Sequence, residues 1–381
     1  MYYITVRQSP MYRQMTLEEL IFGIESGNRT LLNPNTSNTR TYEVNSINHK
    51  FLQMFDIPLL ITKLIQFNTT YESLRQKPRK ELYYTFHIPK KSGGLRRIDA
   101  PNAELKGALN ALKDILEKDF KALYHTSAFA YVKGRCTVDA IKRHQNNESK
   151  WFGKYDLSNF FGSTTLDYVM KMLRMIFPFS EVMKYRDGEE QLAKALELGF
   201  LDGVLPQGTP LSPMLTNIIM IPVDYKLSKE LRNHNKQQFT YTRYADDFQV
   251  SSKYSFKFRE IEQIIVDTLA SFGAPFTLNA SKTRYGSSAG RNWNLGLMLG
   301  ADNKITVGHQ NKRQFWAMLT HYATDKLNGV SWDLHDVQTL EGYRNYYGMV
   351  EGRDYINGVI KELSDKFHID IIESIKKDLR V

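Results

Sequence analysis

The stretch YTRYADDFQV, residues 241–250, decides how the rest of the chain is interpreted. It places two adjacent carboxylates, Asp246 and Asp247, inside a run of aromatic and β-branched residues that is typical of a buried strand. Burying an ionised carboxylate is unfavourable by several kcal/mol unless a positive partner meets it. A metal ion, a basic partner or a tight turn would each explain the pair.

Composition indicates a globular protein with an anionic partner. The chain has 381 residues, is 42% apolar and 12% aromatic, and carries a formal net charge of +10. The length allows about two or three domain-sized units, and the charge favours nucleic acid as a partner. A basic surface without such a partner is the alternative. The single cysteine, Cys136, excludes an internal disulfide framework and a multi-cysteine zinc site.

The chain is expected to be cytoplasmic. No apolar run approaches the roughly 18 to 20 residues that span a bilayer. The amino-terminal segment MYYITVRQSPMYRQ lacks the apolar core of a signal peptide. We therefore expect no membrane partner.

Periodicity and turn signals predict an α+β fold. Strand patterns flank Gly-Gly within 82–101, and further strands or hairpins are predicted at 151–156, 238–252 and 292–308. Helical patterns are predicted at 17–26, 50–75, 103–120, 166–177, 254–273 and, in short pieces, over the last seventy residues. A turn rich in Pro and Gly precedes one long helix within 204–231. This order predicts a sheet with helices packed on one face.

Asp156 ends one predicted strand, and the pair at 246–247 lies at a hairpin tip. In a split βαβ layout the two strands are neighbours, so the three acids converge. Oxygen-only ligands suit Mg²⁺, and two ions roughly 3.5 to 4 Å apart clamp the oxygens of an in-line phosphoryl displacement. Aspartates that merely shape a turn are the alternative interpretation.

Four motifs then carry a family resemblance: YDLSNFF (155–161), LPQGTPLSP (205–213), YADD (244–247) and LNASKT (278–283). In this order and at these intervals they resemble the palm of a bacterial reverse transcriptase, and the resemblance covers residues 81–350. It implies a right-hand polymerase with fingers, a ferredoxin-like palm and a small helical thumb. The implied division is an N-terminal extension at 1–80, fingers and palm at 81–300, and a thumb at 301–381.

The resemblance also implies an activity and its partners. The chain would be an RNA-directed DNA polymerase that uses an RNA template and deoxynucleoside triphosphates, forms a DNA product and binds two Mg²⁺ ions, with Mn²⁺ as a substitute. The implied metal-binding and catalytic residues are Asp156, Leu157 through its carbonyl, Asp246, Asp247 and Lys282. The last of these matches a lysine that donates a proton to departing pyrophosphate.

Further residues match nucleotide- and nucleic-acid-binding positions. The implied nucleotide-binding residues are Lys91, Arg96, Phe161, Gln207 and Gly208. Phe161 matches the aromatic gate that rejects a 2′-hydroxyl by exclusion, and the lysine and arginine would reach the triphosphate. The nucleic-acid-binding residues are Lys133, Arg135, Lys142, Arg143, Lys312, Arg313 and Trp316. A core phenylalanine, a solvated basic turn and ordinary surface or core side chains are the respective alternatives.

The branch of the family is predicted by elimination. Retron enzymes usually carry Val-Thr-Gly near residue 295, where this chain has NLGLM, and nothing after residue 350 resembles the added domains of group II intron proteins. These features favour a stand-alone, phage-defence-associated enzyme that works with a structured noncoding RNA, with a homo-oligomer or partner protein left open. A retron or group II intron-derived enzyme, or an inactive RNA-binding scaffold, is the alternative. The retained acids argue against the scaffold, while Phe161 and Ala245 argue against an RNA-dependent RNA polymerase.

Overall fold

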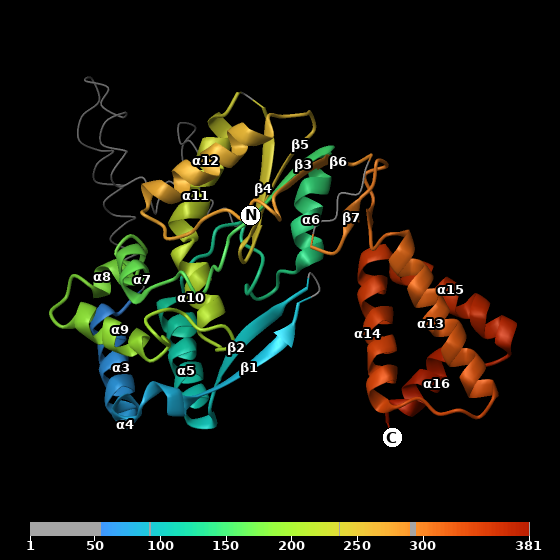
Figure 1. The fold of residues 1–381 in the computed structure, drawn as a ribbon, viewed down its shortest axis with the longest axis horizontal. Helices are drawn as coiled ribbons and strands as arrows, with labels where there is room; N and C mark the ends of the chain where they lie inside the picture. Colours follow the sequence, from blue (N-terminus) through green and yellow to red (C-terminus); the bar gives the residue numbers. More distant parts are fainter. Residues whose placement is uncertain (1–54, 91–92, 236, 290–294, 381) are drawn as a thin grey trace, which may run out of the picture. The chain divides into compact units, whose positions relative to one another are not determined.

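The computed structural model describes residues 55–90, 93–235, 237–289 and 295–380 (Figure 1). The helix predicted at 17–26 and Lys91 lie outside these residues. The chain divides into two compact units, which are described separately. The first contains residues up to 125 together with 159–229 and 265–277, and the second contains 126–158, 230–264 and 278–381.

A four-stranded antiparallel sheet forms the centre of the second unit. Its strands are β3 (Trp151–Asp156), β4 (Phe239–Tyr244), β5 (Asp247–Ser252) and β6 (Arg284–Ser287), in the spatial order β4-β5-β3-β6. In chain order the pattern is strand, helices, two strands, helix, strand, which is the ferredoxin-like arrangement. The strands predicted around the three acids therefore form, and they are neighbours.

Helical residues contact both faces of this sheet. On one face His144 of α6 (Thr137–Asn146) hydrogen-bonds to Thr242 of β4 and Ser251 of β5. On the other, the ring of Tyr155 stacks on Phe258, the first residue of α12 (Phe258–Ser271). Neighbouring strand residues point to opposite faces and cross-strand partners share a face. The prediction of helices on one face is therefore wrong.

The first unit contains the predicted Gly-Gly hairpin. Strands β1 (Tyr83–Pro89) and β2 (Leu95–Pro101) pair antiparallel in the register that sets Pro89 against Leu95. Gly93 and Gly94 have φ values of +86° and +79°, which residues with a Cβ rarely adopt. The hairpin prediction is confirmed.

Helices make up the rest of the first unit. They are α3 (Ile57–Thr70), α4 (Glu72–Gln76), α5 (Ala103–Ile115), α7 (Leu166–Leu173), α8 (Phe179–Val182), α9 (Gly188–Glu197) and α10 (Ser212–Ile219), while α11 (Ile221–Asn233) begins in it. The one long helix predicted after the turn within 204–231 is two helices, because Pro222 lacks the N–H that would continue α10 into α11.

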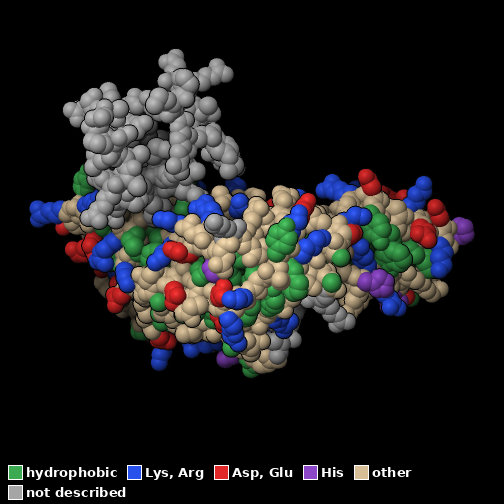
Figure 2. All heavy atoms as spheres, turned by 90° about the horizontal axis from the view of Figure 1, so that it is seen from above, with side chains coloured by type: hydrophobic (Ala, Val, Ile, Leu, Met, Phe, Trp, Pro, Cys, Tyr) green, Lys and Arg blue, Asp and Glu red, His purple; other side chains and the backbone are tan. Residues whose placement is uncertain are grey.

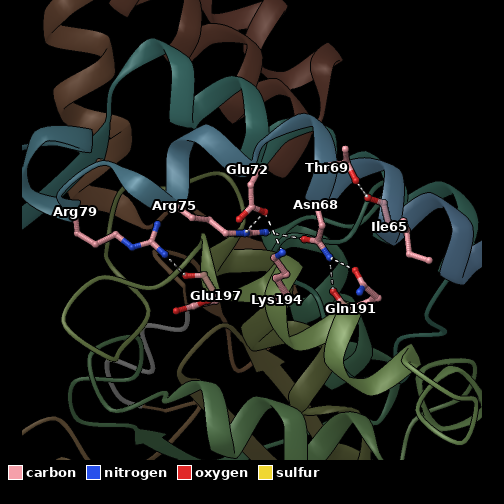
Figure 3. A network of polar contacts seen from close by, with 9 residues as sticks. All are labelled: Ile65, Asn68, Thr69, Glu72, Arg75, Arg79, Gln191, Lys194 and Glu197. Atoms are coloured by element: carbon pink, nitrogen blue, oxygen red, sulfur yellow. Dashed lines mark hydrogen bonds and ion pairs between the residues drawn. The ribbon is translucent and has the colours of Figure 1, made fainter.

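A buried polar network joins α3 and α4 to α9 (Figure 3). Asn68 is 3% exposed, and its Nδ2 donates to the carbonyl and side-chain oxygens of Gln191 at 2.9 and 2.8 Å. Its Oδ1 accepts a 2.6 Å hydrogen bond from Arg75 Nη2. An ion pair of 3.0 Å between Lys194 and Glu72 lies beside it. These contacts tie helices that are about 120 residues apart in sequence.

The C-terminal part of the second unit is helical. A short hairpin of β7 (Met298–Leu299) and β8 (Ile305–Thr306) precedes α13 (His309–Leu327), α14 (Leu334–Glu351), α15 (Arg353–Phe367) and α16 (Ile371–Asp378), which group together in Figure 1. The first three helices are longer than the short pieces predicted. Their buried apolar residues form one core with Val138 and Ile141 of α6 and Phe152 of β3.

Among the described residues, no helix combines the length and the apolar composition that crossing a membrane requires.

Candidate active site

The turn between β4 and β5 carries the two adjacent acids. Tyr244 pairs with Asp247 across the hairpin, so Ala245 and Asp246 form the two-residue turn, with Ala245 at a φ of +57°. Across the sheet, Asp156 is the cross-strand partner of Asp247. The backbone N–H of Leu157 donates to the carbonyl of Asp246 at 3.0 Å. The strand order therefore brings the three acids together at one end of the sheet.

Two lysines face these carboxylates. Lys282 Nζ donates to both carboxylate oxygens of Asp156, at 3.1 and 3.0 Å. Lys154 Nζ lies 3.1 Å from Asp247 Oδ1. Lys154 was not predicted as a site residue, although its position two residues before Asp156 puts it on the same sheet face. This two-residue spacing could have identified Lys154 as a candidate site residue from the sequence.

The negative charge of the acids at the turn is only partly balanced by neighbouring positive charge. Asp156 is 4% exposed. Burial raises the pKa of Asp246 above its ordinary value, and repulsion from Asp156 adds to this effect. Burial also raises the pKa of Asp247, against the opposing charge of Lys154 and with added repulsion from Asp246. The two lysines therefore offset only part of the unfavourable burial of charge.

These residues fit a hard divalent cation. The donor set consists of carboxylate oxygens, which Mg²⁺ prefers. The raised pKa values of Asp246 and Asp247 indicate that nearby positive charge does not fully balance their negative charge. Asp247 Oδ1 is buried against Lys154, with which it forms an ion pair. In the described ranges, no group of three or more acidic, His or Cys side chains is already arranged around one ion position.

The predicted nucleotide-binding residues that are described belong to the first unit. Phe161 lies in the turn before α7, with its ring centroid 5.9 Å from that of Phe160. Arg96 lies on β2 opposite Ile88 and is exposed. Their roles toward a nucleotide stay predictions.

The loop at 207–208 packs against β2. The carbonyl of Gln207 accepts a 2.8 Å hydrogen bond from the N–H of Asp99. Gly208 has a φ of +127°, and a Cβ there would lie 2.8 Å from Ile98 Cγ2 and 3.0 Å from the Asp99 carbonyl oxygen. The protein's own strand therefore explains the glycine, while contact of this loop with nucleic acid stays a prediction.

The predicted nucleic-acid-binding residues divide by their surroundings. Four are exposed: Lys133, Lys142, Arg313 and Trp316. The other three are partly buried. Arg135 Nη1 donates to the Ala128 carbonyl at 2.5 Å, Arg143 Nη1 donates to the Thr126 carbonyl at 2.6 Å, and Lys312 Nζ lies 2.6 Å from Glu351 Oε2. On the face drawn in Figure 2, Lys and Arg side chains are interspersed with Asp and Glu. The binding roles of all seven residues stay predictions.

Comparison with known proteins settles the family. A family model described as "Reverse transcriptase (RNA-dependent DNA polymerase)" matches residues 88–315. The chain belongs to this family. It is a reverse transcriptase with the right-hand polymerase fold, and its activity is that of an RNA-directed DNA polymerase.

Similar reverse transcriptases carry retron names. Retron Ec83 reverse transcriptase of Escherichia coli is 28% identical over 313 residues, which cover 80% of this chain and 92% of that protein. Retron Ec73 reverse transcriptase of the same organism is 31% identical over 206 residues, or 53% of this chain and 64% of its own. The retron alternative, which the sequence at 295–299 disfavoured, is therefore compatible with the comparisons.

Among solved structures, the chain is similar to the telomerase from Candida albicans in complex with a fragment of telomeric RNA. Its TM-score is 0.44 at 13% identity, and the match covers 77% of this reverse transcriptase and 54% of the telomerase chain.

Proposed function

We propose that this reverse transcriptase forms DNA on an RNA template at the site built by Asp156, Asp246 and Asp247. The observation that carries the proposal is the cross-strand pairing of Asp156 with Asp247, with the Leu157 N–H bound to the Asp246 carbonyl. Two buried strands thereby present acids from distant parts of the sequence at one end of the sheet.

Asp156 and Asp246 would hold two divalent cations, Mg²⁺ or Mn²⁺, with the Leu157 carbonyl and Asp247 assisting. When bound, such a pair stabilises the charge that develops on the oxygens of a phosphoryl displacement. Lys282 forms an ion pair with Asp156 and is more than half exposed, and it would give a proton to departing pyrophosphate. Lys154 partly neutralises Asp247 beneath the turn.

The remaining roles concern substrate choice. Phe161 would exclude the 2′-hydroxyl of ribonucleotides, and Arg96 with Lys91 would bind the triphosphate of a deoxynucleotide. Gln207 and Gly208 would support the templating base pair. The exposed basic and aromatic residues Lys133, Lys142, Arg313 and Trp316 would contact the nucleic-acid backbone and bases.

We further propose a structured noncoding RNA as the template, in a cytoplasmic enzyme of antiviral defence. The net charge of +10 supports a polyanionic partner. The retron names of the relatives support an enzyme of the retron kind as the alternative. Sequencing the RNA and DNA that co-purify with the protein distinguishes the defence enzyme from an enzyme of the retron kind.

The test of the active site is replacement of Asp246 by Asn. We expect loss of at least about 10³-fold in deoxynucleotide incorporation on an RNA template, because an amide supplies no charge to a cation. RNA affinity, measured by filter binding, stays within about threefold. Asp354→Asn, at an exposed position in the first turn of α15, is the matched control and keeps full activity. An active Asp246→Asn enzyme contradicts the proposal.

A further inference from the structure

The largest fully buried side chain among the described residues is an arginine, Arg243. It is 1% exposed and lies on β4, two residues before the turn that carries the acids. A guanidinium stays charged in proteins, so its burial is unfavourable and calls for hydrogen-bonding partners in fixed positions. Its cross-strand partner is Phe248, which places both on the sheet face opposite Asp247.

Arg243 forms hydrogen bonds both to the turn that carries the acids and to a separate segment of the chain. Its Nη1 donates to the carbonyl of Ala245 at 3.1 Å. Its own backbone N–H donates to the Ser127 carbonyl at 2.7 Å, and its carbonyl accepts a 2.9 Å hydrogen bond from the Phe129 N–H. The residue therefore connects the turn to the 127–129 segment, which covers the outer edge of β4.

The turn needs such support because of Ala245. Its φ of +57° is in the left-handed region, where a residue with a Cβ is disfavoured and glycine is not. The two carbonyls of the turn are each held by a donor, that of Ala245 by Arg243 and that of Asp246 by the Leu157 N–H. Together these bonds fix the peptide planes on either side of Asp246, and thus the direction of its side chain.

We propose that Arg243 is a positioning residue that stabilises the left-handed turn at Ala245 and thereby orients Asp246 and Asp247. This inference rests on the proposed function, since it assigns a purpose to the geometry of those acids. Arg243 acts from the face of the sheet that does not carry Asp247. In this role Arg243 supports the backbone of the site and does not itself contact a metal ion or the substrate.

The test compares Arg243→Met with Val250→Ala. Val250 is fully buried on β5 and belongs to the same sheet but not to the turn, so its truncation reports loss of stability alone. For Arg243→Met we expect kcat to fall at least 10-fold with the KM for deoxynucleotide within threefold. We expect Mn²⁺ affinity, measured without substrate by the electron paramagnetic resonance of free Mn²⁺, to weaken at least threefold. Val250→Ala keeps both within twofold at a temperature where it is folded.

Two further variants keep the test decisive. Arg243→Lys retains a long cationic donor and should recover part of both losses, which also covers the case in which the methionine variant does not fold. Adding Ala245→Gly to either variant removes the backbone strain and should recover kcat at least threefold. The inference is overturned if the Arg243 variants keep the kcat and the Mn²⁺ affinity of wild type, or if their losses only equal those of Val250→Ala. Asp246→Asn is measured in parallel and is inactive if the proposed function holds. Failure of the positioning role of Arg243 is therefore distinguishable from failure of the proposed active site.

Discussion

Lys312 Nζ lies 2.6 Å from Glu351 Oε2 where β8, α13 and α14 meet. The carboxylate side chain is 9% exposed and also accepts hydrogen bonds from Thr306 Oγ1 and the Val307 N–H. Removing the ammonium would leave this buried charge with a poorer set of partners. The lysine therefore has a structural function whether or not it also contacts nucleic acid.

We expect Lys312→Met to lower the free energy of unfolding by about 1 to 3 kcal/mol, measured by urea denaturation. Arg313→Met, at the exposed neighbouring position, should leave stability within about 0.5 kcal/mol. It should instead weaken duplex binding a few-fold and lower the slope of log affinity against log salt by about 1. The reverse pattern would show that Lys312 is the residue that binds nucleic acid.

Sugar selectivity tests Phe161. Replacement by Ala removes the ring that would meet a 2′-hydroxyl, so ribonucleotide incorporation should rise by about 10- to 100-fold relative to deoxynucleotide. The measurement is the ratio of kcat/KM for the two nucleotides on one RNA template. Phe160→Leu, at the buried neighbouring position, is the control and should leave the ratio unchanged. Unchanged selectivity in the Phe161 variant would mean that the gate is elsewhere.

His144 makes stability depend on pH. Burial, with repulsion from Arg143, lowers its pKa to about 3, whereas an unfolded histidine titrates near 6.5. Between these values the unfolded chain binds a proton that the folded chain does not. Stability is therefore fully present above the unfolded pKa and falls as the pH drops toward the folded one, by up to about 1.4 kcal/mol per pH unit.

The comparison is between wild type and His144→Gln, which cannot titrate, in urea unfolding at pH 7.5, 6 and 5. The variant should be less stable at pH 7.5, because it loses bonds to Thr242 and Ser251. Its disadvantage should shrink as the pH falls below about 6.5. A difference that stays constant with pH would contradict a neutral, buried His144.

Asn68 tests the network of Figure 3. Asn68→Ala removes two bonds to Gln191 and one from Arg75 within the buried contact of α3 with α9. We expect a loss of about 2 to 3 kcal/mol in the free energy of unfolding, since two acceptor oxygens of Gln191 and one donor nitrogen of Arg75 each lose this partner in a buried contact. Thr69→Ala, next along the helix, loses only a bond to the Ile65 carbonyl of its own helix and should change stability by less than about 0.5 kcal/mol.

The palm could be predicted from the sequence because its signals are local. Alternation of apolar residues around 241–250, the acid at the end of 151–156 and the Gly-Gly turn each lie within a few residues. The strand order then followed from a common layout, and the structure has that order.

The sequence could not show contacts between residues that are far apart along the chain. A lysine or arginine in a sequence is readily assigned to a nucleic-acid surface, yet the partner of Lys312 is Glu351, thirty-nine residues later. Arg243 was not singled out at all, because nothing near it in sequence indicates that an arginine is buried. Gly208 is predicted to contact nucleic acid, and the sequence did not show that its tight neighbours in the protein belong to β2, more than a hundred residues earlier.

The apolar core shared by the palm and the C-terminal helices limits how the enzyme can be shortened. Val138, Ile141 and Phe152 pack in the same cluster as Leu319 and Tyr322 of α13. A truncation that ends at residue 300 would therefore expose the side chains beneath the catalytic sheet to water. We therefore expect a shortened form of this polymerase to need the C-terminal helices to keep this sheet folded, whatever those helices do for the template.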